Sequence, residues 1–217
     1  MIKSKRFLSA IALLVFSFSG YSQISFSPGF SAGLNVSNFR ATDSAGNAAE
    51  PEPKSLTGFQ AGVFAEIGIL GFFSVVPGLE YSQRGATAVD TVNFKIVSSF
   101  DYLTVPVLLK FKYGALPIKP FLAVGPELGF LLSAKSKIHQ VFMTRAIDTT
   151  FDVTDSGAST DFGLKIAGGA ELDLGKIAPF IQASYYFGFL NIQKHSNGDF
   201  TTLNRLFNIQ AGLRFKL

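Results

Sequence analysis

Cysteine is absent from this chain of 217 residues, and only two histidines are present. Without thiols there is neither a disulfide framework nor a thiolate metal site. Charged residues are scarce at 16%, and the apolar residues, which include 24 phenylalanines, are interleaved with glycine and serine. A soluble β-sandwich can show such a composition. A membrane β-barrel accounts better for so many apolar residues in an exposed pattern.

The first residues have the layout of a secretory signal peptide. Cations within residues 3–6 precede an apolar run at 7–18 and small residues at 19–22. The run is too short for a spanning helix, so we expect a signal peptide at residues 1–22 and a mature chain at 23–217. Its removal takes away three cations and lowers the formal net charge from +4 to +1. The basic balance therefore gives no support for nucleic-acid binding.

The C-terminal segment alternates polar and apolar residues up to the last position. Every second side chain from Phe207 onward is apolar, and the positions between them are polar or glycine. This period suits a strand with lipid on one side and a polar interior on the other. The segment also resembles the closing-strand assembly signal of outer-membrane barrels, although such signals usually end on an aromatic residue. The residues that match are Gln210, Gly212, Phe215 and Leu217.

Eight segments show the same two-residue period, separated by gaps that alternate between long and short. Each is long enough for a tilted strand across a bilayer, which needs roughly 9–11 residues. An open sheet edge would leave backbone groups without partners in hydrocarbon, so the sheet must close. We therefore predict an all-β fold, an eight-stranded antiparallel transmembrane up-and-down β-barrel in one domain. The segments are 26–39, 56–69, 72–84, 97–113, 119–135, 160–174, 177–191 and the stretch after 203.

The gaps predict the orientation of the barrel. Short turns are typical of the periplasmic end of outer-membrane barrels, and long loops are typical of the cell exterior. An even number of strands then places both termini in the periplasm, and the protein in the outer membrane of a Gram-negative bacterium. The short turns are 70–71, 114–118 and 175–176, and the long polar gaps are 40–55, 85–96, 136–159 and 192–203.

Three prolines lie inside predicted strands, at Pro77, Pro106 and Pro126. Proline lacks the N–H that a β-ladder needs. We expect bulges or weakly paired strand ends to absorb these residues.

An ordered set of short motifs resembles the PorT-like family of outer-membrane β-barrels of Bacteroidetes. The resemblance covers nearly the whole mature chain and implies the fold and the location. It implies no active-site residues, and the namesake's involvement in type IX protein secretion does not transfer on these motifs alone. The motifs are Gly33–Phe39, Gly58–Gly62, Leu79–Gly85, Leu103–Lys110, Lys119–Pro126 and Gly212–Phe215.

The predicted inner face carries charges of both signs. One interpretation is a polar conduit with charge selectivity. The other is a plug of paired charges, because the interior of an eight-stranded barrel is just wide enough for side chains to fill it. The mixture of signs favours pairing, since an unpaired buried charge is very costly. The residues are Glu66, Glu80, Lys110, Lys112, Glu127, Lys165, Glu171 and Arg214.

Catalytic and metal sites have little support in the sequence. His139 and His195 fall in different predicted loops, and nothing in their spacing indicates a hydrolase or a metal site. The carboxylates Asp148, Asp152 and Asp155 suit calcium, but their spacing differs from that of an EF-hand. We interpret these residues as parts of solvated loops and expect no cofactor.

The favoured function is a structural or interaction role in the envelope, with an accessory role in protein secretion as one form of it. The expected partners are outer-membrane lipids, the barrel-assembly machinery, and other envelope or secretion proteins that contact the exterior loops. A narrow pore for small solutes is the alternative. An outer-membrane enzyme acting on lipid or peptide is the third hypothesis, and no nucleic acid is expected.

Overall fold

The computed structural model describes residues 24–43, 53–91, 94–114, 117–142, 145–154, 158–192 and 200–217. The predicted signal peptide lies outside these ranges. Within them, no helix is long and apolar enough to cross a membrane. The described strands are β1 (Ser25–Asp43), β2 (Lys54–Leu70), β3 (Phe73–Thr91), β4 (Phe94–Lys112), β5 (Ile118–Phe142), β6 (Arg145–Asp152), β7 (Thr160–Leu172), β8 (Ile177–Gly188) and β9 (Phe200–Phe215).

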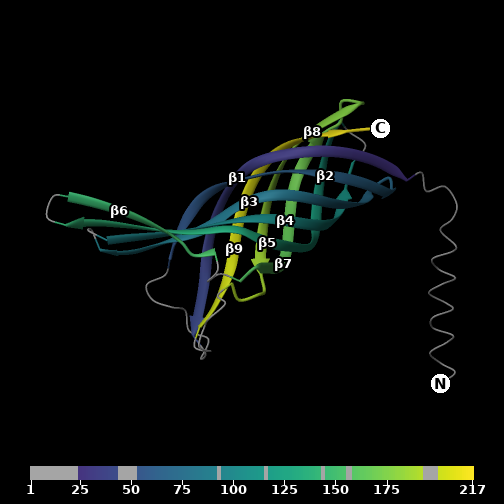
Figure 1. Cartoon of the computed structure of the whole chain (residues 1–217). Coiled ribbons are helices and arrows are strands. Elements are labelled where there is room, and N and C mark those ends of the chain that lie inside the picture. Colours follow the sequence, from purple (N-terminus) through teal and green to yellow (C-terminus); the bar gives the residue numbers. More distant parts are fainter. Residues whose placement is uncertain are drawn as a thin grey trace, which may run out of the picture.

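Eight of these strands form a closed antiparallel ring (Figure 1). Each of β1 to β5 pairs with its neighbour in sequence, β7 follows β5, and β9 closes the ring by pairing with β1. Closure gives every strand two partners, as a sheet in hydrocarbon requires. The predicted eight-stranded antiparallel barrel is therefore confirmed. Among the described strands, β6 is the one outside the ring, and it pairs with β5.

The burial pattern is the reverse of that in a soluble protein. Outward side chains are apolar and exposed, as Leu122 and Ile181 illustrate at 67% and 59%. Inward side chains are largely polar and buried, as Asn35 and Thr104 illustrate at 0%. Each strand thus presents its apolar residues to the surroundings and its polar residues to the lumen. This arrangement is stable only where the surroundings are lipid.

The strands β3, β4 and β5 continue past the ring and form a projecting sheet with β6 (Figure 1). This sheet consists of residues 85–91, 94–100, 133–142 and 145–152. The prediction of polar loops at 85–96 and 136–159 is wrong for most of these residues. Outside the membrane a strand needs no apolar face, so the lipid-type alternation that marked the barrel strands stops while the pairing goes on. The fifth strand also contains a bulge after Leu131, so that Ser133 pairs with Asp101 and the two-residue alternation shifts by one residue from this point on.

The prolines interrupt the ladder without shifting it. β3 and β4 keep one register on both sides of Pro77 and Pro106, since Pro77 pairs with Val107 and Glu80 with Thr104. The expectation of bulges or strand ends at these prolines is therefore wrong. Pro126 sits in a ladder with β7 that continues without a shift. The missing N–H groups are accommodated by short unpaired stretches inside regular strands.

Tight turns join strands at one end of the barrel, which we call the short-turn end, at residues 71–72 and 173–176. The described residues 113–114 and 117 lie at the same end, where the N–H of Asp173 donates to the carbonyl of Pro117. Gly114 and Gly175 have φ angles of 107° and 83° there, a conformation that glycine adopts without strain. The N–H of Gly175 donates to Asp173 Oδ1 at 3.1 Å, so the turn ends β7 at Leu172, two residues before the predicted boundary. The projecting sheet lies at the opposite end.

Candidate functional site

The two-residue period brings charged side chains from six strands into the lumen. All eight predicted lumen charges lie inside the ring, and each takes part in at least one ion pair. Together with Arg84 and Asp161 they form two groups. The proximal cluster, near the short-turn end, consists of Glu66, Lys110, Lys112, Glu171 and Arg214. The distal cluster consists of Glu80, Arg84, Glu127, Asp161 and Lys165.

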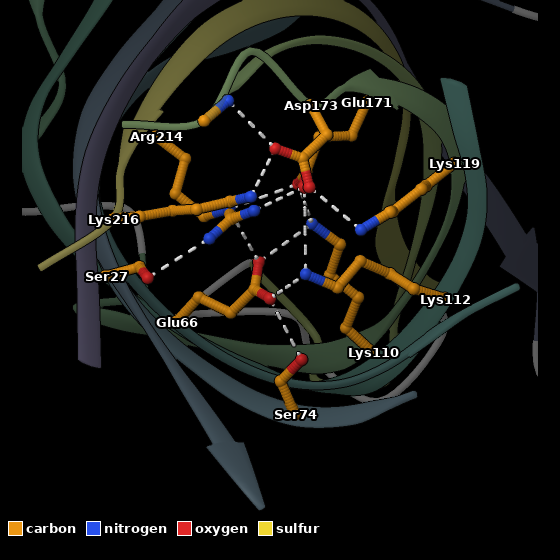
Figure 2. Close-up of polar contacts among 11 residues, drawn as sticks. Ser27, Glu66, Ser74, Lys110, Lys112, Lys119, Glu171, Asp173, Arg214 and Lys216 are labelled. Atoms are coloured by element: carbon orange, nitrogen blue, oxygen red, sulfur yellow. Dashed lines mark hydrogen bonds and ion pairs between the residues drawn. The ribbon is translucent and has the colours of Figure 1, made fainter. Parts of the chain in front are cut away.

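In the proximal cluster three cations converge on two buried carboxylates (Figure 2). Lys110 Nζ lies 3.0 Å from Glu66 and 3.3 Å from Glu171. Arg214 donates from Nε to Glu171 at 3.1 Å, and Lys112 pairs with Glu66. Because a buried charge without a partner costs several kcal/mol, these five side chains hold one another in place.

A phenylalanine layer, made of Phe64, Phe121 and Phe180, separates the two clusters. The ring centre of Phe180 lies 5.6 Å from that of Phe64 and 6.4 Å from that of Phe121. Lys110 Nζ lies 4.1 Å from the centre of the Phe121 ring, which adds a cation–π contact. The cavity at this level measures only about 40 Å³, room for no more than a few water molecules.

Glycines on neighbouring strands make room for these rings. A Cβ atom on Gly29 would lie 2.4 Å from Phe64 Cζ, and a Cβ atom on Gly212 would lie 2.4 Å from Phe180 Cζ. Real side chains do not approach so closely. The inward glycines therefore allow large rings to lie across the adjacent strand and fill the lumen.

The distal cluster is centred on Arg84, which the sequence interpretation missed. Its Nη1 lies 3.0 Å from Asp161, and its Nη2 pairs with Glu127. The guanidinium also lies 4.4 Å from the ring centre of Tyr186 and 5.2 Å from that of Tyr102. Planar stacking together with several directed hydrogen bonds is a combination that arginine supports and lysine does not.

Two further contacts complete the distal cluster. Lys165 Nζ lies 2.7 Å from Glu80 and 3.1 Å from Glu127, and Gln60 donates to Glu80 at 2.6 Å. The sequence could have predicted Arg84, because Glu80, Ser82 and Arg84 are two residues apart and therefore share the inward face of one strand. Asp161 also belongs to this cluster and is absent from the predicted set of lumen charges.

The seam between the first and last strands is held by amides. Asn208 on β9 donates from Nδ2 to Asn35 Oδ1 on β1 at 2.8 Å. Asn35 in turn donates to Ser82 Oγ at 3.1 Å and to the carbonyl of Gln83 at 2.9 Å. One buried amide thus connects β9, β1 and β3 across the lumen wall.

The residues of the C-terminal motif have different surroundings. Gln210 is buried in the lumen, 3.4 Å from the donating amide of Gln60. Phe215 faces outward at 6.1 Å from Phe30, measured between ring centres, and Leu217 is fully exposed at the short-turn end. Gly212 lies beneath the ring of Phe180, as described above.

At the short-turn end, Lys119 and Lys216 reach Asp173 from opposite sides (Figure 2). Lys119 Nζ lies 2.8 Å from Asp173 Oδ2, and Lys216 pairs with Oδ1. These hydrogen bonds, that from Lys119 first, hold the pKa of the Asp173 carboxyl well below its usual range. Asp173 therefore stays ionised through the ordinary pH range.

The remaining candidate residues lie on the projecting sheet or outside the described part of the chain. His139 Nδ1 lies 2.5 Å from Asp148, and this hydrogen bond lowers the pKa of the Asp148 carboxyl. Asp152 accepts hydrogen bonds from Thr154 in an exposed turn. His195 and Asp155 fall outside the described residues. Within the described ranges, no three metal-ligating side chains gather into one group.

A ring of eight strands with an apolar exterior and an ion-paired interior defines a small outer-membrane β-barrel. Residues 18–194 match the family described as "Outer membrane protein beta-barrel domain". The chain belongs to this family, which implies a location in the outer membrane. Among proteins of curated function, none matches this sequence.

Several solved outer-membrane proteins are similar to this chain, and one of them supports the fold. The outer membrane protein OprG from Pseudomonas aeruginosa is 11% identical, with a TM-score of 0.51, and the match covers 91% of this chain and 98% of OprG. Neisserial surface protein A is 14% identical with a TM-score of 0.47, covering 87% of this chain and 97% of the other. The outer membrane protease OmpT from Escherichia coli is 8% identical with a TM-score of 0.42, covering 91% and 99%. At these identities the likeness concerns the fold alone.

Proposed function

We propose that this protein is a non-conducting anchor in the outer membrane that holds the projecting sheet as a docking surface for other envelope proteins. The observation that carries the proposal is the filling of the lumen by three successive layers, the proximal cluster, the phenylalanine layer and the distal cluster. Members with different activities share this fold, so fold alone does not select a function.

The lumen contacts argue against conduction. An ion that crossed the barrel would have to separate buried ion pairs, and separation of one such pair costs about 3–5 kcal/mol. It would also have to pass three phenylalanine rings that leave only about 40 Å³. We expect planar-bilayer recordings of the purified full chain to show no discrete conductance steps. Steps whose ion selectivity changes in Lys110→Glu or Glu127→Lys would establish a pore instead.

The projecting sheet supports the docking role. Strand β6 pairs with β5 on one side, and its residues Thr149, Thr150 and Phe151 are exposed. A sheet edge of this kind can accept an added strand from a partner protein, because the edge and the added strand form backbone hydrogen bonds with each other. An extended segment of another envelope protein is the proposed occupant. A component of protein secretion is one form that such a partner would take.

Site-specific cross-linking in intact cells tests the docking role. A photo-reactive residue replacing Thr149 on β6 is expected to capture an envelope protein. The same residue replacing Lys176, which is exposed at the short-turn end, serves as the control and should not capture that protein. Equal capture at both positions, or capture of lipid alone at Thr149, would contradict the proposal.

We also propose that the C-terminal motif delivers the chain to the barrel-assembly machinery. Phe215 and Leu217 end the closing strand on its exposed face, where another protein can reach them before the ring closes. Replacing Phe215 by Ala should lower the amount of folded barrel in the membrane while the purified variant still folds in detergent. Loss of folding in both settings would show a structural role only.

A further inference from the structure

A polar basin opens at the short-turn end of the lumen, and it suggests a binding activity beyond the proposed anchor function. Its volume is about 300 Å³, which reaches the lower range of small-molecule sites. It is lined by Ser27, Glu66, Ser74, Lys112, Lys119 and Lys216 together with Arg214 and turn residues. The proximal cluster and the phenylalanine layer lie between the basin and the distal cluster. If the lumen is non-conducting, as proposed above, a solute that enters from this end stays in the basin.

The side chains around the basin have a surplus of positive charge. Five cations lie in the lining or next to it, namely Lys110, Lys112, Lys119, Arg214 and Lys216. They are balanced in part by the side-chain carboxylates of Glu66, Glu171 and Asp173 and by the terminal carboxylate of Leu217, which leaves a positive balance. The distal cluster has the opposite balance, with two cations and three carboxylates. The cationic surplus is thus local to the short-turn end, where low-dielectric barrel walls focus its field into the basin.

The cations at the mouth are accessible to a ligand. The side chains of Lys119 and Lys216 are 30% and 31% exposed, and that of Lys112 is 13% exposed. A lysine ammonium has three donors, so each can keep its carboxylate and still donate to an incoming oxygen. Deeper in the basin, Ser27 Oγ accepts from Arg214 at 3.1 Å, and its own hydroxyl hydrogen can turn toward the cavity.

We propose that this basin binds inorganic phosphate or a compact phosphate monoester from the aqueous compartment at the short-turn end. A phosphate has the charge that offsets the local surplus and several acceptor oxygens for the converging ammonium groups. The lining faces the barrel axis and not the bilayer, so a soluble anion fits the site better than a lipid headgroup.

Calorimetric titration of the detergent-solubilised full chain with inorganic phosphate, at constant ionic strength in chloride, tests the proposal. Saturable binding to one site is expected. The double variant Lys119→Gln, Lys216→Gln should weaken it by about tenfold or more. The matched control Lys135→Gln, Lys137→Gln also removes two cations, but from the projecting sheet, and should bind like the parent chain.

A third variant raises the surplus instead of lowering it. Asp173→Asn removes one carboxylate, keeps an oxygen that can accept from Gly175, and should tighten phosphate binding several-fold. Heat-modifiable gel mobility verifies that each variant is folded. Absence of saturable binding by the parent chain, equal weakening by the control, or weaker binding by Asp173→Asn would overturn the proposal.

Discussion

Arg84 shows at the residue scale how this lumen is stabilised. Its side chain is 1% exposed, and it satisfies two carboxylates from β5 and β7 while its guanidinium plane contacts Tyr102 and Tyr186. Glu127 also pairs with Lys165, but the ion pair of Asp161 is with Arg84. Loss of this cation leaves Asp161 as a buried charge without a counter-charge, which is far more costly than a neutral side chain in the same place.

Replacing Arg84 by Met should therefore destabilise the barrel by about 3–5 kcal/mol. Urea unfolding in detergent, followed by far-ultraviolet circular dichroism, measures the change. Lys137→Met is the control, because both side chains of the Lys137–Asp148 ion pair are exposed to solvent. Exposed ion pairs contribute about 0–1 kcal/mol to stability. Similar losses in both variants would show that burial is not what makes Arg84 important.

Gly212 tests the packing of the phenylalanine layer. A Cβ atom there would lie 2.4 Å from Phe180 Cζ, whereas one on Gly71 would have nothing within 4 Å. Gly212→Ala should cost about 1–3 kcal/mol by overpacking, and Gly71→Ala should have little effect. Adding Phe180→Leu to Gly212→Ala should recover part of the loss in the same urea experiment. No recovery would mean that the strain lies in the backbone contacts of Gly212.

At the scale of elements, the ring does not require the tip of the projecting sheet. Beyond the last contacts of β5 with β7, the end of β5 pairs with β4 on one side and with β6 on the other. Replacing residues 136–151 by Asn-Gly should leave a folded barrel, because Lys135 and Asp152 are ladder partners that a two-residue turn can join. Unchanged heat-modifiable mobility is the expected result, and an unfolded product would show that the sheet helps to close the ring.

Because Asp173 lies in the turn after β7 with a lowered pKa, we expect the stability of the barrel to depend on pH. The pKa of the Asp173 carboxyl is lowered in the folded chain, whereas in the unfolded chain it is about 3.9. Around pH 4 the unfolded chain therefore binds more protons than the folded chain. The stability contributed by Asp173 is then fully present above that pH and is lost as the pH falls through the folded-state value. Asp173→Asn should be less stable than the parent at pH 7, with a difference that shrinks below pH 4. A constant difference would contradict the assignment.

On the scale of the whole molecule, orientation decides which compartments the basin and the projecting sheet face. Because the chain has no native cysteine, a single introduced thiol reports its own position. A membrane-impermeant maleimide should label Thr149→Cys in intact cells, and should label Gly71→Cys only after the outer membrane is permeabilised. Both residues are exposed in the folded barrel. The reverse labelling pattern would invert the proposed orientation.

The two-residue period alone predicted the number of ring strands, the face of each lumen charge and the fold. It succeeded because lipid imposes the same rule on every strand, apolar outward and closed at both edges. It failed where that rule stops applying. The residues of the projecting sheet were predicted to be loops. The bulge after Leu131 shifted the alternation in the fifth strand. Arg84 was left out because it is the last residue of the third predicted strand.

Tertiary structure alone decided which charges meet. Glu66 and Glu171 are 105 residues apart in sequence, and they share Lys110 only because the closed ring brings β2 and β7 to face each other across the lumen. The division into proximal and distal clusters, the phenylalanine layer and the cationic basin follow from strand stagger and register. A periodic pattern states which side of a strand a residue occupies, but its height along the barrel depends on hydrogen bonds to other strands.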